Sequence, residues 1–81
     1  MERTELEELL RGALPGIDWN ASERLVDDRI VNSLDLMAVL TALHFEKGIR
    51  IPGNEMKAEN FNSVEAMLDL CRRYETGRSK Q

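Results

Sequence analysis

The sequence predicts an all-α fold: a small four-helix bundle, made of three main helices and one short helix, with a long loop between helices one and two. Three segments repeat apolar residues at the three- and four-residue spacing of a helix. No segment alternates apolar and polar residues over a useful strand length. The chain has 81 residues, enough for one small core. We therefore expect a single domain over residues 1–76 and a flexible polar tail over residues 77–81.

Helix one is expected from Glu2 to about Ala13, because leucines recur on one face while charged side chains fill the other. Pro15 and Gly16 then end it, since neither favours a helix interior. The connector from Pro15 to Asn32 is long for so small a domain, and loops of that length tend to carry function. Its apolar residues should fasten it to the core: Ile17, Trp19, Leu25, Val26, Ile30 and Val31.

Helix two is expected from Ser33 to about Lys47. Its apolar residues cover more than one face, which is typical of a central helix in contact with several neighbours. Gly48 follows in the C-terminal capping position, where a left-handed backbone is common. Pro52 then keeps the chain from continuing at once as helix. The apolar residues of this helix are Leu34, Leu36, Met37, Ala38, Val39, Leu40 and Leu43.

The last third of the chain predicts a short helical turn from Glu55 to Glu59 and then the third main helix. That helix should start at Asn62, whose side chain can cap it with Glu65 three residues later as the acidic partner. It should end near Tyr74. Cys71 falls on its apolar stripe, so we expect a small buried side chain rather than a nucleophile.

The composition disfavours several classes of function. The formal net charge is −4, and the only basic cluster is the pair Arg72 and Arg73, which argues against a nucleic-acid partner. The only histidine is His44 and the only cysteine is Cys71, so no Cys/His metal-ligand spacing and no internal disulfide is available. No apolar run approaches membrane-spanning length. We expect a monomeric, cytoplasmic protein that is not an enzyme.

Ser33 has two interpretations. In the simpler one, Asn32 or Ser33 only starts helix two, since both residue types favour the N-cap. The spacing favours Asn32 as the cap with Asp35 as its acidic partner, which leaves Ser33 at the first helical position with its hydroxyl toward solvent. Free backbone N–H groups at that point can accept a phosphate group. Since the sequence offers no base to activate the serine, we expect Ser33 to be modified by another enzyme.

Three segments stand in a distinctive order: NSLDL at residues 32–36, FEKGIRIP at residues 45–52 and ENFNSVEAML at residues 59–68. Together they resemble acyl carrier proteins, the four-helix modules that bear a 4'-phosphopantetheine arm, including small stand-alone carriers such as D-alanyl carrier proteins. The attachment motif of that family is Asp-Ser-Leu, and Ser33 with Leu34 matches its last two positions. Asn32 stands in place of the usual Asp, and Ile30 stands where a glycine is common.

The resemblance implies that residues 1–76 form a carrier domain and that a phosphopantetheinyl transferase attaches the arm from coenzyme A to Ser33. The terminal thiol of the arm would hold an acyl or aminoacyl group as a thioester. Activating ligases, acyltransferases or synthases would then receive it. The resemblance also implies a partner-binding surface made of Asn32, Leu34, Asp35 and Met37.

Helix two departs from the family in its charge, since Ala38 and His44 fall where acidic residues are frequent. We therefore expect partners that recognise shape more than charge. Two alternatives stay open: an unmodified helical interaction module, and a small hydrolase or transferase using Ser33, which the missing base disfavours. The cargo also stays open among fatty acyl, polyketide, amino-acid and D-alanyl groups.

Overall fold

The computed structural model describes residues 1–75, and every regular element within them is helical. The elements are α1 (Arg3–Ala13), α2 (Ser33–Lys47), the short 3-10 turn η1 (Gly53–Glu55), α3 (Ala58–Phe61) and α4 (Val64–Glu75). The predicted all-α class is confirmed, with α1, α2 and α4 as the main helices. The tail predicted at residues 77–81 lies outside the described residues.

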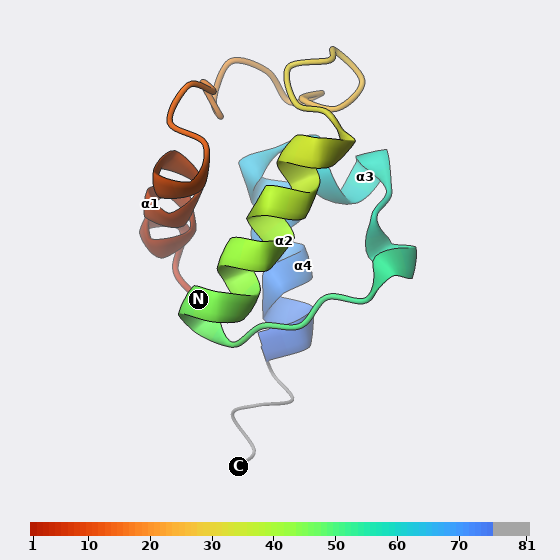
Figure 1. Cartoon of the computed structure of the whole chain (residues 1–81). Coiled ribbons are helices and arrows are strands. Elements are labelled where there is room, and N and C mark those ends of the chain that lie inside the picture. The colour runs from red at the N-terminus through yellow and green to blue at the C-terminus, as the bar shows by residue number, and fades with distance from the viewer. Residues whose placement is uncertain (76–81) are drawn as a thin grey trace.

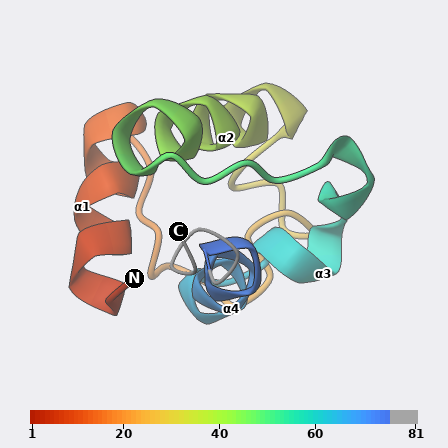
Figure 2. The ribbon, with the colours of Figure 1, turned by 90° about the horizontal axis from the view of Figure 1, so that it is seen from below.

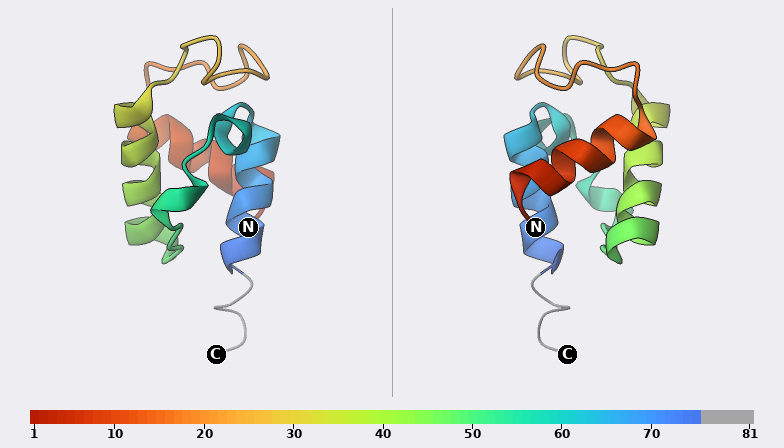
Figure 3. Two further views of the ribbon diagram at one scale, coloured as in Figure 1. Left: turned by 90° about the vertical axis from the view of Figure 1, so that its right-hand side faces the viewer. Right: turned by 90° about the vertical axis from the view of Figure 1, so that its left-hand side faces the viewer.

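The three main helices surround one core (Figure 1). α1 packs against both α2 and α4, and α3 packs against α4. Seen from below, α2 and α4 lie on opposite sides of the molecule, with α1 along one flank and α3 on the other (Figure 2). The loop from residue 14 to residue 32 contains no helix or strand, and it arches over the end of the bundle where α2 begins (Figure 3). This loop therefore leads directly into the first residue of α2.

The core is apolar, and among the described residues it buries no polar or charged side chain. Burial of these side chains is the main driving force for packing the helices together. The long loop contributes to the core through Trp19, Leu25 and Val31, each at most 5% exposed. The prediction that loop residues fasten the connector to the core is thus confirmed for these three. The fully buried side chains from the rest of the chain include Leu6, Leu10, Val39, Leu43, Ile49, Phe61, Met67, Leu70 and Cys71.

Two local predictions differ from the structure. The helical turn expected at residues 55–59 is split into η1 and α3, which are separated by Met56 and Lys57. Asn62 does not cap the last helix, because it follows α3 with helical backbone angles (φ −71°, ψ −20°), whereas an N-cap needs an extended backbone. The hydroxyl of Ser63 instead accepts a hydrogen bond from the N–H of Ala66 at 3.0 Å. The capping role predicted for Asn62 is therefore wrong.

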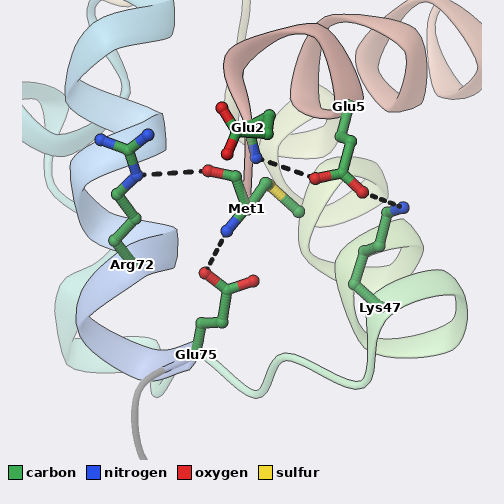
Figure 4. Close-up of polar contacts among 6 residues, drawn as sticks. All are labelled: Met1, Glu2, Glu5, Lys47, Arg72 and Glu75. Atoms are coloured by element: carbon green, nitrogen blue, oxygen red, sulfur yellow. Dashed lines mark hydrogen bonds and ion pairs between the residues drawn. The ribbon is translucent and has the colours of Figure 1, made fainter. Parts of the chain in front are cut away.

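A group of polar contacts closes the end of the bundle opposite the long loop (Figure 4). The amino-terminal ammonium of Met1 pairs with the carboxylate of Glu75, and Arg72 Nε donates to the Met1 carbonyl at 3.2 Å. Lys47 Nζ lies 3.5 Å from Glu5 Oε2, which ties the end of α2 to the start of α1. These contacts link all three main helices at a distance from Ser33.

A second polar group fastens η1 to α4. The Tyr74 hydroxyl donates to Glu55 Oε2 at 2.5 Å, and Asn60 Nδ2 donates to the Glu55 carbonyl and side chain at 2.8 and 3.1 Å. Arg73 lies 3.8 Å from the same carboxylate. The hydroxyl of Tyr74 is the main reason that the pKa of Glu55 lies below its usual range, and the carboxylate in turn raises the pKa of Tyr74.

Candidate functional site

Ser33 is the first residue of α2, and its side chain is exposed. Asn32 precedes it with an extended backbone (φ −118°, ψ −178°), as an N-cap requires. Asn32 Oδ1 accepts from the Asp35 N–H at 2.9 Å, and Asp35 Oδ2 accepts from the Asn32 N–H at 3.0 Å. Asn32 and Asp35 therefore form the predicted capping box, and helix two starts without any help from the Ser33 hydroxyl.

The hydroxyl of Ser33 makes no hydrogen bond with any other residue in the described range, 1–75. Three carboxylates are nearest to it in sequence, those of Asp27, Asp28 and Asp35, and each already accepts a hydrogen bond from another residue. His44 lies eleven residues further along α2, about 16 Å away along the helix axis. None of these side chains is hydrogen-bonded to the Ser33 hydroxyl as a general base would be.

The face of α2 next to Ser33 is apolar and open to solvent. Leu34 is 77% exposed and Met37 is 56% exposed. Residues three and four positions apart lie on the same face of a helix, so Met37 lies beside both Ser33 and Leu34. Phe45, near the other end of α2, is 80% exposed. Its ring packs edge to face on the ring of His44, with the two ring centroids 5.2 Å apart. The structure thus brings Ser33, Leu34 and Met37 together, while Asn32 and Asp35 are occupied with each other at the helix start.

The last part of the loop before Asn32 and Ser33, residues 25–31, is a compact turn. The N–H groups of Ile30 and Val31 both donate to the Leu25 carbonyl, at 2.9 and 3.1 Å. Arg29 adopts a left-handed backbone with φ 62°, a conformation that side chains other than glycine rarely take. Leu25 is fully buried, and Val31 is 2% exposed. The turn is therefore anchored to the core at both of its ends.

Asn62 also belongs to this site, although the sequence pattern assigned it to the start of the last helix. Its side-chain oxygen accepts from the N–H groups of Val26 and Asp27, at 2.9 and 3.1 Å. Asparagine favours such bonds to turn backbones. Its preference for helix caps is equally strong, so residue type alone could not have revealed which role it takes.

Cys71 is the only cysteine of the chain, and it is buried in α4 at 1% exposure. Burial raises the pKa of its thiol to about 11, and the nearby Glu75 carboxylate acts in the same direction. A thiol in this state is a poor nucleophile and a poor metal ligand. The prediction of a buried side chain is confirmed.

Within residues 1–75 there is no group of three or more His, Cys, Asp or Glu side chains that could hold a metal ion. No helix in that part of the chain has the length and apolar character needed to cross a membrane. A scan against models of protein families and a search of curated proteins both find no match to this chain.

Proposed function

We propose that this chain is an acyl carrier protein that bears a 4'-phosphopantetheine arm on Ser33. The observation that carries the proposal is the position of that serine: an exposed and unbonded hydroxyl at the first position of α2, released from capping by Asn32 and Asp35. Because the cap is complete without Ser33, its exposed hydroxyl is open to modification. The resemblance of residues 25–70 to carrier proteins points to the same residue.

Attachment needs a transferase, since the chain has no base at Ser33. In the proposed step the Ser33 Oγ forms a bond to the phosphorus of coenzyme A that carries the pantetheine. The bond from that phosphorus to the adenosine bisphosphate breaks, and the serine proton passes to a base of the transferase. The site fits the group because one exposed hydroxyl is enough to hold it. When bound, the arm supplies the thiol that forms a thioester.

The thioester thiol must come from the arm, because Cys71 is buried and its thiol pKa is raised to about 11. The chain itself positions the arm for the partner enzymes. Leu34 and Met37, exposed beside Ser33, would contact the transferase and the enzymes that load and unload the arm. The carboxylate of Asp35 is held by the Asn32 N–H at the helix start, so it is oriented toward the cap. These features favour partners that read an apolar shape.

The proposed role extends to the location of the carrier and the source of its cargo. We place the carrier in the cytoplasm as a monomer that receives its cargo from an acyl- or amino-acid-activating ligase. Fatty acyl, polyketide, amino-acid and D-alanyl groups all need the same serine, so the activating enzyme and not Ser33 decides the cargo. An adenylating ligase as partner would indicate amino acids, and a ketosynthase would indicate acyl chains.

The experiment that tests the proposal is intact mass spectrometry after incubation with coenzyme A and a phosphopantetheinyl transferase of broad specificity. The expected result is one added phosphopantetheine on the wild type and none on Ser33→Ala. That variant should fold normally, because the removed hydroxyl has no partner in residues 1–75. Thr41→Ala is the matched control, since it removes another exposed hydroxyl of α2 that has no partner in residues 1–75, and it should still be modified.

A second candidate is an unmodified helical module that binds a partner through α2. The observation in its favour is the exposure of three large apolar side chains on one helix, Leu34, Met37 and Phe45. A folded wild-type chain that several transferases leave unmodified would support this candidate. Ser33 would then be only the first residue of α2.

A further inference from the structure

Asn62 makes four hydrogen bonds to the loop that precedes α2. Its carbonyl accepts from the Leu25 N–H at 2.8 Å. Its side-chain oxygen accepts from the N–H groups of Val26 and Asp27, at 2.9 and 3.1 Å. Its side-chain nitrogen donates to Asp27 Oδ2 at 3.0 Å. Residues that are 35 and 36 positions apart in sequence are thereby held together.

The same loop segment sets the start of α2. The Leu25 carbonyl receives the N–H groups of Ile30 and Val31, and Val31 is followed directly by the capping residue Asn32. A shift of the turn would therefore move Asn32 and Ser33 with it. Among residues 1–75, Asn62 is the residue from a distant segment whose side chain bonds to the backbone of this turn.

The bonds of Asn62 are specific to the loop and do not support a helix end. α4 is capped by Ser63, and α2 is capped by Asn32 and Asp35. Loss of the Asn62 side chain would leave two loop N–H groups without their acceptor. The helices keep their own caps, so the effect should fall on the loop.

We propose that Asn62 is a positioning residue for the modification of Ser33. By holding the Leu25–Val31 turn, it keeps the loop and the exposed start of α2 in the one arrangement that the transferase recognises. The inference rests on the proposed function of Ser33. It adds a residue from the junction between α3 and α4 to the recognition of the carrier.

The test is steady-state kinetics of phosphopantetheine transfer to wild type, Asn62→Ala, Asn62→Asp and Asn60→Ala. For Asn62→Ala we expect the KM for the carrier to rise about tenfold with little change in kcat, since only the fraction of chains with a well-placed loop can bind. Asn62→Asp should give a KM between those of the wild type and Asn62→Ala, because its carboxylate can accept from both loop N–H groups but is repelled by the carboxylate of Asp27. Faster amide hydrogen exchange at Val26 and Asp27 in Asn62→Ala would report the loosened loop directly.

Asn60→Ala is the matched control. Asn60 lies on α3, two residues before Asn62, and also uses its side chain to hold a connector, but its partner is Glu55 and not the Ser33 loop. It should lose stability without a change in KM. An unchanged KM in Asn62→Ala, or an equal rise of the KM in Asn60→Ala, would overturn the positioning role. A wild-type chain that is never modified would overturn the proposed function itself, and the positioning role with it.

Discussion

Asn32 and Asp35 hold each other across the first turn of α2 through two hydrogen bonds of 2.9 and 3.0 Å, each from the backbone N–H of one residue to the side chain of the other. This reciprocal pair satisfies two of the N–H groups that a helix start leaves open. Ser33, which lies between the two residues, is therefore not needed to cap the helix. Carrier proteins, which the chain resembles, usually have aspartate at this place, and asparagine serves the same capping function without a charge.

Asn32→Ala should therefore lower the free energy of unfolding by about 1 kcal/mol, because Ala cannot accept from the Asp35 N–H. For a domain of this size the loss corresponds to a fall in Tm of about 4–8 °C. Thermal unfolding followed by circular dichroism is the measurement. Asn32→Asp keeps an acceptor oxygen and should melt close to the wild type. Equal melting of Asn32→Ala and the wild type would show that the cap contributes nothing to stability.

The parts of this structure that the sequence predicts well are set by local spacing. Leu6, Leu9 and Leu10 are buried on one face of α1 as their periodicity requires. The cap formed by Asn32 and Asp35 spans only three positions, and both residue types are typical of it. Fold class, helix order and the exposure of Ser33 follow from such short-range patterns.

The parts that the sequence does not predict depend on contacts between distant segments. Asn62 suits a helix cap as well as a turn, and only the packed fold brings it to Val26 and Asp27. Arg29 gives no sign of its left-handed backbone, because arginine has no preference for that region. Within residues 1–75, the loop that precedes Ser33 is thus the part that the sequence predicts least well.

Docking on the face beside Ser33 should depend on apolar contact more than on charge. Leu34→Ala and Met37→Ala remove exposed apolar surface that a partner would bury, and each should raise the Kd for the transferase about fivefold. Fluorescence anisotropy at low and high salt is the measurement, and the wild-type Kd should change by less than about threefold between them. Glu46→Gln is the control, since it removes an exposed charge from α2. A strong salt dependence, or a larger effect in Glu46→Gln, would contradict an apolar docking face.

Cys71 should be unreactive in the folded chain. With its thiol pKa raised to about 11 by burial, roughly one thiol in a thousand is ionised at pH 8, and the reagent must also reach a side chain that is 1% exposed. Titration with a chromogenic disulfide reagent should show no fast-reacting thiol in the native apo-protein and one after denaturation. The modified protein should show one fast thiol, from the arm. A fast thiol in native Ser33→Ala would contradict the burial of Cys71.

The Glu55–Tyr74 pair should make stability depend on pH at both ends of the scale. The folded pKa of Glu55 is lowered from its usual 4.5, so its contribution is present above that value and is lost as the pH falls through the folded pKa. The folded pKa of Tyr74 is raised from its usual 10.0, so its contribution is present below that value and is lost as the pH rises through the folded pKa. The Tm difference between wild type and Tyr74→Phe should be constant between these limits and should shrink outside them. Glu55→Gln should remove the acid-side change, and a Tm difference independent of pH would argue against the pair.

Arg29 holds a left-handed backbone (φ 62°) in the turn before Ser33, and its side chain has no hydrogen-bond or ion-pair partner within residues 1–75. A left-handed residue other than glycine is strained by about 1–2 kcal/mol. Arg29→Gly removes that strain, and the greater freedom of glycine in the unfolded chain offsets about 0.5–1 kcal/mol of the gain. The bond from the Arg29 N–H to the Val26 carbonyl at 3.0 Å can remain.

We therefore expect Arg29→Gly to raise the free energy of unfolding by up to about 1 kcal/mol, measured by urea denaturation with an unchanged m-value. Arg29→Ala is the matched control, because it removes the same charge but keeps the Cβ atom that causes the strain. Its free energy of unfolding should not exceed that of the wild type. Equal stability of the two variants would mean that the backbone at position 29 is not strained. No strain would then oppose the contacts that hold the turn before Ser33, which are the Asn62 bonds and the burial of Leu25 and Val31.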